Sequence, residues 1–332
     1  MRNFIILIFI LITSSLNANE WEDRQVFTSG EATQILKILS STDTTFFEPI
    51  IKSYLQKNPN IKIEYYVTGT ASLDEIFRKS PEQYDLIISS AMDLQLKLVN
   101  DGYAKKINEI VHPSWAKWRQ SLFAFTIEPA AIVLNKNAFK NTIIPKTRQD
   151  LIKELRSRPT FFENKIGTYD VRKSGLGYLF ATQDARTSET FWRLMEVMGG
   201  LGTKLYCCSG DMIDDLVSGK IAVAYNVLGS YAEARKQKSD EIEIILPADF
   251  PTNMMRTALV SNLTSRLRLS EKFMQHLLEN QTEKKVDGTH SLPPLFLKPG
   301  QQTIILEPAL MTYLDKLKRK TFIKEWERAI IQ

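Results

Sequence analysis

The stretch "QILKILSSTDTTFFEPIIKSYLQKNPNIKIEYYV" (residues 34–67) decides the fold class. Its first eight residues are an apolar run of strand length, and residues 46–59 then carry Phe47, Ile50 and Tyr54 at helical spacing. Residues 61–67 form a second apolar run of strand length. A strand, a helix and a strand in this order predict a βαβ unit.

The alternation of strands and helices continues beyond this unit. Residues 72–80 predict a short helix, residues 84–90 a buried strand, and residues 91–102 a helix that Gly102 ends. This order is typical of a doubly wound, largely parallel sheet. The extended apolar segment 122–139 is long enough to leave that sheet and enter a second lobe.

A second series of strands and helices follows and predicts the second lobe. The stretch 256–262 is again extended and apolar, so we expect it to cross back to the first lobe. The last helix, within 308–330, is expected to pack against the first lobe. The prediction is therefore an α/β, two-lobed fold, each lobe a mostly parallel sheet flanked by helices, with a cleft between the lobes. Its expected parts are a signal peptide (1–18), the first part of lobe 1 (19–126), lobe 2 (127–250) and the return to lobe 1 with the C-terminal helices (251–332).

The first residues predict a cleaved secretory signal peptide. Arg2 supplies a positive charge, residues 4–12 are an uninterrupted apolar run, and Ala18 is a suitable residue before the cut. A membrane anchor is the alternative, but a spanning helix needs about 20 apolar residues. The expected location of the mature chain is therefore the periplasm.

Charge and cysteine content exclude some classes of function. Loss of Arg2 with the signal peptide lowers the formal net charge from +5 to +4, and no basic stripe of the kind that binds nucleic acid is present. Cys207 and Cys208 are the two cysteines of the chain. A bond between them is one alternative, but neighbouring side chains of extended backbone point to opposite sides, which favours two reduced thiols. We expect no metal and no cofactor.

Small polar residues follow five of the predicted strands, where each strand gives way to a helix. One such loop alone is more simply explained by helix capping. Five at the same end of two sheets predict a ligand site, because helix N-termini hold anions and Arg172 adds a full charge. Asp43 is the discordant member, since its carboxylate would repel an anion unless it points away, binds a ligand hydroxyl or meets Arg172. The candidate ligand-binding residues are Ser41, Thr42, Thr44, Thr68, Thr70, Ser89, Ser90, Tyr169, Asp170, Arg172, Ser174, Gly175, Asn226, Gly229, Ser230 and Tyr231.

No known catalytic motif in the sequence supports an enzyme. The nucleophile elbow G-x-S-x-G and the phosphate loop G-x-x-x-x-G-K-[ST] do not occur. Asp43 and Asp170 would form an acid–base pair only if both face the cleft, and helix capping is the simpler role for them. An enzyme on this fold remains an alternative.

Five segments carry a resemblance to a known family that runs over nearly the whole mature chain. The sequence resembles the type 2 periplasmic solute-binding proteins of ABC uptake systems, in the branch with ferric-iron, hexose-phosphate and phosphoglycerate transport regulatory proteins. The resemblance implies two lobes, a hinge, a closing cleft and a monomer. Its expected partners are a small anionic metabolite and either an ABC permease or a membrane sensor kinase. The segments are "YDLIISSAMDLQLKLVNDGYA" (84–104), "EPAAIVLNK" (128–136), "YDVRKSGLGYLFATQDA" (169–185), "SGKIAVAYNVLGSYAEAR" (218–235) and "LEPALMTYLDKLKRKTFIKEW" (306–326).

The same resemblance raises the possibility of ferric iron. Ferric-binding relatives use an adjacent pair of tyrosines in a strand-end loop of the second lobe, where this chain has Tyr231 alone. We therefore expect an organic phosphate or carboxylate, for example a sugar phosphate, delivered to a permease. The alternatives are a ligand-sensing accessory protein for a sensor kinase, a ferric-iron binding protein and an enzyme.

Overall fold

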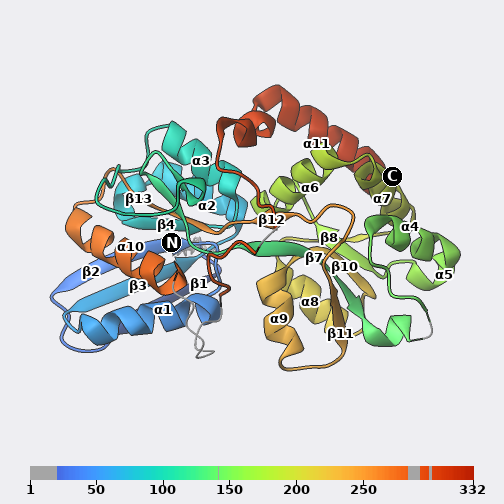
Figure 1. Ribbon diagram of the computed structural model, residues 1–332, viewed down its shortest axis with the longest axis horizontal. Coiled ribbons are helices and arrows are strands. Elements are labelled where there is room, and N and C mark those ends of the chain that lie inside the picture. Colours follow the sequence, from blue (N-terminus) through green and yellow to red (C-terminus); the bar gives the residue numbers. More distant parts are fainter. Residues whose placement is uncertain (1–20, 141, 283–291, 299–300) are drawn as a thin grey trace, which may run out of the picture.

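Two β-sheets lie side by side, and helices cover each of them (Figure 1). The computed structural model describes residues 21–140, 142–282, 292–298 and 301–332, so the predicted signal peptide lies outside the described residues. The two-lobed α/β class predicted from the sequence is confirmed. Among the described residues, no helix has the length and apolar character needed to cross a membrane.

The first sheet contains the predicted βαβ unit. Strand β2 pairs in parallel with β3, from Gln34 opposite Ile61 to Ser40 opposite Val67, and α1 connects the two. The order of the sheet is β1 (Asp23–Thr28), β3 (Ile61–Val67), β2 (Gln34–Ser40), β4 (Leu86–Ser89), β13 (Thr257–Val260), β6 (Leu122–Ala124) and β5 (Lys117–Trp118). The helices of this lobe are α1 (Thr44–Lys57), α2 (Thr70–Lys79), η1 (Pro81–Gln83), α3 (Met92–Asn100), η2 (Ser114–Ala116) and α10 (Leu267–Thr282).

The second sheet is built on β7, the strand that brings the chain across. Its order is β11 (Ile242–Ile245), β7 (Glu128–Asn135), β10 (Val223–Leu228), β8 (Ile166–Tyr169) and β9 (Lys204–Tyr206), and β12 (Asn253–Met254) also pairs with β7. The helices of this lobe are η3 (Lys136–Phe139), α4 (Arg148–Ser157), α5 (Pro159–Phe162), α6 (Gly175–Thr187), α7 (Thr190–Gly200), α8 (Ser209–Val217) and α9 (Gly229–Lys236). The last elements are η4 (Pro308–Leu314) and α11 (Lys316–Ile330).

The expectation of mostly parallel sheets needs a correction, because both sheets are mixed. Parallel pairing is confined to β3, β2 and β4 in the first sheet and to β10, β8 and β9 in the second. Strands β7 and β13 enter from the other lobe at the end where the parallel strands finish, as the pairing of Thr257 with Ser89 shows. A strand that starts there must run antiparallel to its neighbours.

The chain passes between the lobes at three places. Residues 125–127 join β6 to β7, residues 255–256 join β12 to β13, and the chain between α10 and α11 makes the third passage. The apolar core has one cluster inside each lobe and a third with members in both, among them Leu96 of α3 and Val227 of β10. The exact lobe boundaries stay predictions.

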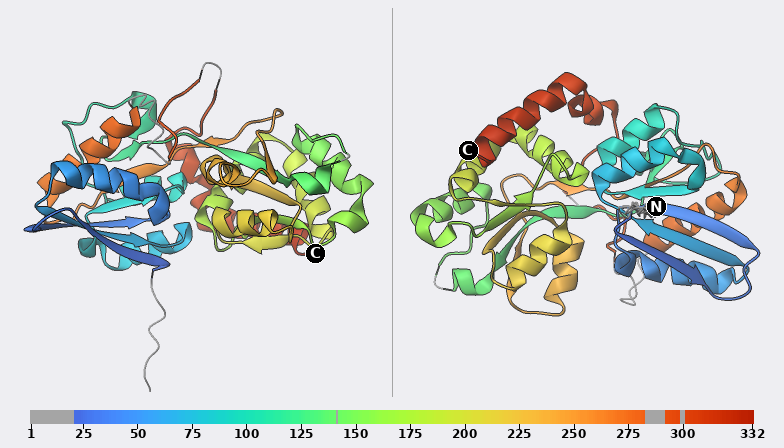
Figure 2. Two further views of the ribbon diagram at one scale, coloured as in Figure 1. Left: turned by 90° about the horizontal axis from the view of Figure 1, so that it is seen from below. Right: turned by 180° about the vertical axis from the view of Figure 1, so that it is seen from behind.

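The expected position of the last helix is wrong. Helix α11 lies along the second lobe, where Phe322 and Trp326 are buried in the same apolar cluster as Leu194 of α7 (Figure 2). Gly199 of α7 permits the close approach, because a Cβ atom there would overlap the carbonyl oxygen of Ala329. The preceding η4 contacts α3 of the first lobe.

Candidate functional site

A cavity of about 390 Å³ lies at the carboxyl ends of the parallel strands, between the two lobes. Ligands of open α/β sheets bind at such strand ends, and this volume suits a small molecule. Residues of both lobes contribute to its wall. The lining residues are Glu22, Ser41, Asp43, Thr68, Gly69, Thr70, Ala71, Ser72, Glu75 and Ser90 from the first lobe, and Tyr169, Arg172, Lys173, Ser174, Leu176, Cys207, Cys208, Ser209, Leu228 and Tyr231 from the second.

Five helices begin at this cavity, and the residue that caps each of them lines it. They are α1, α2, α6, α8 and α9, whose N-cap residues are Asp43, Gly69, Ser174, Cys208 and Leu228. Of these caps, Ser174 alone accepts a hydrogen bond from its own helix through its side chain. The other four helices therefore point first-turn N–H groups at the cavity without that cap, and their dipoles favour negative charge there.

Half of the predicted site residues lie in the wall of the cavity. They come from all three strand-end loops of the first lobe and from two in the second, and the structure places these loops around one cavity. The lining members are Ser41, Thr68, Thr70, Ser90, Tyr169, Arg172, Ser174 and Tyr231. Their contact with a ligand stays a prediction.

Thr42 and Ser230, by contrast, belong to a buried network at the first two interlobe passages. Arg256 donates to Glu128 from Nε to Oε1 (2.9 Å) and from Nη2 to Oε2 (3.1 Å), and neither residue is exposed to solvent. Arg256 Nη1 also donates to Thr42 Oγ1 at 2.6 Å. The hydroxyls of Thr126 and Ser230 donate to Glu128. We call Thr42, Thr126, Glu128, Ser230 and Arg256 the hinge network.

Three further predicted residues make local polar contacts instead of lining the cavity. Thr44 Oγ1 donates to Asp23 Oδ2 of β1 at 2.6 Å. Ser89 Oγ accepts from Ser41 Oγ at 3.1 Å and thereby positions a residue that does line the cavity. Asn226 is buried and donates from Nδ2 to Asp184 Oδ2 at 2.9 Å.

Asp170, Gly175 and Gly229 also lie outside the lining. Asp170 accepts two hydrogen bonds from the guanidinium of Arg172, from Nε to Oδ1 and from Nη2 to Oδ2, both at 2.8 Å. Gly175 and Gly229 serve close packing, because a Cβ atom would lie 2.9 Å from Leu94 Cδ1 or 2.8 Å from Pro129 Cγ, respectively. Asp170 therefore has no free carboxylate for an acid–base pair with Asp43.

The charges of the cavity wall were only partly predicted. Asp43 lines the cavity together with Glu22 and Glu75, and no pattern in the sequence marks these two glutamates. Burial raises the pKa of Glu22, and the carboxylates of Asp43 and Asp211 raise it further. Burial also raises the pKa of Asp43. The cavity therefore combines helix ends that attract an anion with carboxylates that accept hydrogen bonds.

Two basic side chains reach the cavity, but they differ in how far they are already paired. Arg172 is held by Asp170 and by Glu327 of α11, with Nη1–Oε1 at 3.2 Å. Lys173 is exposed and has no ion-pair partner among the described residues. Lys173 is therefore the cation that a bound anion would meet without competition.

The two lobes touch each other around the cavity. The backbone N–H of Leu176 in α6 donates to Thr70 Oγ1 in α2 at 3.1 Å. The rings of Phe46 and Tyr231, one from each lobe, have centroids 4.3 Å apart. The lobes are therefore in direct contact beside the cavity.

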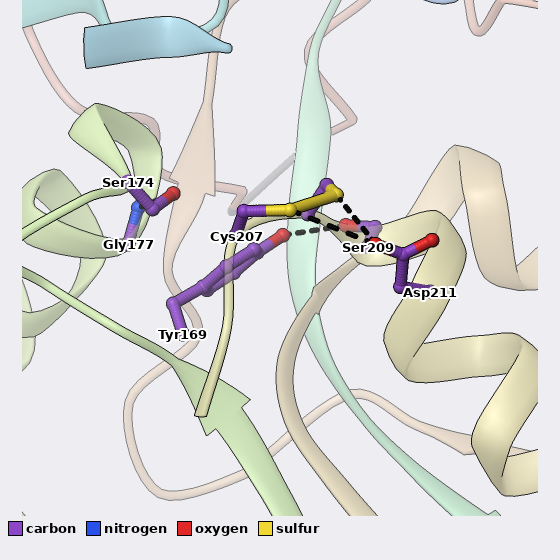
Figure 3. Close-up of a disulfide and its surroundings, with 7 residues drawn as sticks. Tyr169, Ser174, Gly177, Cys207, Ser209 and Asp211 are labelled. Carbon is purple, nitrogen blue, oxygen red and sulfur yellow. Dashed lines mark hydrogen bonds between the residues drawn. A yellow bond between two sulfur atoms is a disulfide. The ribbon is translucent and has the colours of Figure 1, made fainter. Parts of the chain in front are cut away.

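Cys207 and Cys208 form a disulfide in the wall of the cavity, which corrects the expectation of two reduced thiols (Figure 3). Cys208 does have extended backbone angles, but the pair lies between β9 and α8, and both residues line the same cavity. The next residue, Ser209, bonds to the hydroxyl of Tyr169 at 2.5 Å and so ties this loop to β8.

The cavity is a poor match to a ferric site. Its two tyrosines, Tyr169 and Tyr231, come from separate loops, not from an adjacent pair. Burial raises the pKa of Tyr169 and of Tyr231, which disfavours the phenolate that ferric iron requires. In the part of the chain that the structure describes, the one group of three potential metal ligands among His, Cys, Asp and Glu is Cys207, Cys208 and Asp211.

Comparisons with known proteins identify the family and the fold. The family model described as "Bacterial extracellular solute-binding protein" matches residues 40–252. A substrate-binding protein of an ABC transporter from Agrobacterium tumefaciens superposes with a TM-score of 0.86 at 29% identity, over 93% of this chain and 98% of that one. No curated protein matches the sequence.

Two more distant structures show the same fold with different named ligands. The periplasmic binding protein AfuA of Actinobacillus pleuropneumoniae, with bound fructose-6-phosphate, superposes with a TM-score of 0.74 at 14% identity, over 90% of this chain and 99% of that one. A periplasmic thiamin binding protein superposes with a TM-score of 0.69 at 15% identity, over 92% of this chain and 100% of that one.

Proposed function

This chain belongs to the bacterial extracellular solute-binding proteins, and we propose that its cavity captures a small organic anion for an ABC permease. The anionic group is a phosphate or a carboxylate. The signal peptide predicted at residues 1–18 supports a periplasmic location, and the family supports a role in binding without turnover.

The convergence of helix N-termini from both lobes is the observation that carries this proposal. Helices α1 and α2 of the first lobe and α6, α8 and α9 of the second all start at the cavity. Unpaired N–H groups and the positive ends of helix dipoles bind phosphate and carboxylate groups. Lys173 adds a full positive charge at the same place.

The carboxylates of the wall refine the class of ligand. Glu22, Asp43 and Glu75 would repel a compact ion such as inorganic phosphate. They accept hydrogen bonds from hydroxyl or amino groups, so the ligand carries such groups beside its anionic end. A sugar phosphate has both parts, and the fructose-6-phosphate complex of AfuA shows that this fold accommodates one.

Closure of the lobes would complete the site. The loops of each lobe supply part of the wall, so a ligand that bridges them stabilises the closed arrangement. Small-angle scattering is expected to show a more compact protein with ligand than without it. An unchanged scattering profile with a confirmed ligand would contradict this mechanism.

A thermal-shift screen followed by calorimetry tests the class of ligand. The panel contains sugar phosphates, phosphoglycerates, di- and tricarboxylates, thiamin, inorganic phosphate and Fe³⁺. A ligand of the folded state raises the melting temperature, and we expect the shift with a hydroxylated organic phosphate or carboxylate. A shift with Fe³⁺ or thiamin alone would overturn the proposal.

Two controls separate the remaining alternatives. Lys173→Gln is expected to weaken binding of the identified anion, whereas Lys238→Gln, at an exposed lysine outside the cavity, leaves it unchanged. Recovery of the unaltered ligand after prolonged incubation supports binding without turnover. Appearance of a product would instead favour an enzyme on this fold.

A further inference from the structure

The disulfide of the cavity wall stands next to a carboxylate that points at both of its sulfur atoms. Asp211 Oδ2 lies 3.2 Å from Cys208 Sγ and 3.6 Å from Cys207 Sγ (Figure 3). A disulfide has no S–H group to donate, so these short approaches gain no hydrogen bond while the two sulfurs are joined. The proposed capture of an organic anion does not account for this arrangement.

The local fold explains why the three groups converge. Cys208 is the N-cap of α8 and Asp211 lies in its first turn, three residues on, where a side chain reaches back toward the cap. Cys207 precedes the cap and completes a cluster whose ligand atoms all lie within 4.8 Å of one another. Cys207 and Asp211 are exposed and Cys208 is partly so, and both cysteines line the cavity.

We propose that Cys207, Cys208 and Asp211 bind one thiophilic divalent cation, such as Zn²⁺ or Cd²⁺, when the disulfide is reduced. Two thiolates and one carboxylate supply three of the four ligands of a tetrahedral site. The fourth position faces the cavity and is free for water or for a ligand. The oxidised protein offers no thiolate and does not form the site.

The chemistry of the change balances with a dithiol as reductant. Thiol–disulfide exchange breaks the bond between Cys207 Sγ and Cys208 Sγ, and the two sulfurs of the reductant become joined instead. Its two protons pass to the sulfurs of the protein. The cation then displaces these two protons as it forms two metal–sulfur bonds, and the charge of Asp211 is retained.

Two features of the surroundings favour a cation with thiolate ligands. The N-terminus of α8 stabilises thiolates at its cap position. The carboxylates of Glu22 and Asp43 line the same cavity as the two cysteines, so a cation there lowers the repulsion among the acidic groups. Neither feature depends on the identity of the organic ligand.

Cadmium titration of the full chain tests the proposal with the metal alone. The protein is reduced with a dithiol, freed of it by gel filtration under nitrogen, and titrated at pH 7 while the ultraviolet sulfur-to-cadmium band and proton release are recorded. We expect one Cd²⁺ per chain, release of two protons, and no band for the oxidised protein.

Matched variants on one helix distinguish the cluster from a general effect of thiols. Asp211→Asn is expected to weaken Cd²⁺ binding roughly tenfold or more. Asp214→Asn, which removes a carboxylate on α8 that pairs with Arg235 outside the cavity, leaves it unchanged. Cys208→Ser is expected to abolish the two-thiolate site, and a circular dichroism spectrum like that of the wild type shows that the variant folds.

The result that would overturn the proposal is an unaffected Asp211→Asn variant, two Cd²⁺ ions per chain, or no binding to the reduced wild type. Each outcome is independent of the organic-anion screen, because that screen uses the oxidised protein. Failure of the metal site would therefore leave the proposed transport function standing, and the reverse also holds.

Discussion

Two groups of polar side chains lie between the lobes, the hinge network and the wall of the cavity, and they are built from the same loops. Thr42 belongs to the network and its neighbour Ser41 to the wall; Ser230 belongs to the network and its neighbour Tyr231 to the wall. In the network every hydroxyl meets Arg256 or Glu128. The wall residues Ser41 and Tyr231 instead line the cavity. Adjacent residues therefore divide between the buried network at the interlobe passages and the wall of the cavity.

The largest expected effect on stability comes from removing one charge of the ion pair in the hinge network. Arg256→Met leaves the carboxylate of Glu128 buried without its partner, so we expect a loss of about 3–5 kcal/mol in the free energy of unfolding. Urea denaturation measures it. The double variant Arg256→Met/Glu128→Leu is expected to lose less than the single one, because it removes the uncompensated charge. Equal losses would show that the pair matters through packing.

Asp93 belongs to neither group: it is deeply buried and has no ion pair among the described residues. It lines a second interlobe cavity of about 320 Å³, beside Arg319 of α11. Burial raises the pKa of Asp93 to about 7. Between about pH 4 and pH 7 the folded state holds a proton that the unfolded state has lost, so stability falls as the pH rises through this window.

Asp93→Asn is expected to abolish that pH dependence. At pH 8 the variant gains at most about 4 kcal/mol over the wild type, and the gain vanishes near pH 4. Thermal or urea denaturation at several pH values measures the difference. Parallel curves for the two proteins across the whole range would contradict the assignment to Asp93.

The neighbouring pair Ser230 and Tyr231 tests the division most directly. Ser230→Ala removes a hydrogen bond to the charged Glu128 and is expected to cost about 1.5–3 kcal/mol of stability, with ligand affinity unchanged. Tyr231→Phe is expected to change stability by less than about 1 kcal/mol and to lower ligand affinity several-fold. Denaturation measures the stability of both variants and calorimetry their ligand affinity. A loss of affinity in Ser230→Ala and a loss of stability in Tyr231→Phe would contradict the assigned roles.

The smallest effect on stability is expected at Lys173, the exposed cation of the wall. Lys173→Gln should leave the free energy of unfolding within about 0.5 kcal/mol of the wild type. Its binding of the organic anion should become weaker and less sensitive to salt, because one charge–charge attraction is lost. Calorimetry at two ionic strengths measures both changes. An unaltered salt dependence would remove Lys173 from the site.

The sequence was sufficient for the elements whose periodicity is local. The βαβ unit of residues 34–67 has the predicted elements in the predicted order, because apolar spacing alone defines them. Strand β1 was not predicted: its residues Asp23–Thr28 are mostly polar and exposed, and they pair at the edge of the sheet. The side on which α11 packs was wrong, since Leu314 to Ile330 show an apolar face but not its partner.

The same limit applies to the site. The strand-end position of Ser41 and Thr42 could be read from the sequence, but their separate roles depend on Arg256, more than 200 residues further on. Glu22 reaches the cavity from just before β1, in a segment without a signal of its own. Contacts between residues distant in sequence decide these cases, and no local pattern records them.

The position of β13 has a consequence for the order in which the chain can fold. This strand lies between β4 and β6 in the first sheet, yet it comes after every strand of the second. Until residue 260 is available, β4 has an open edge and β5 and β6 have no sheet to join. The first lobe therefore begins before the second and finishes after it, a sequence of events that favours slow folding and leaves an unpaired strand edge open to aggregation.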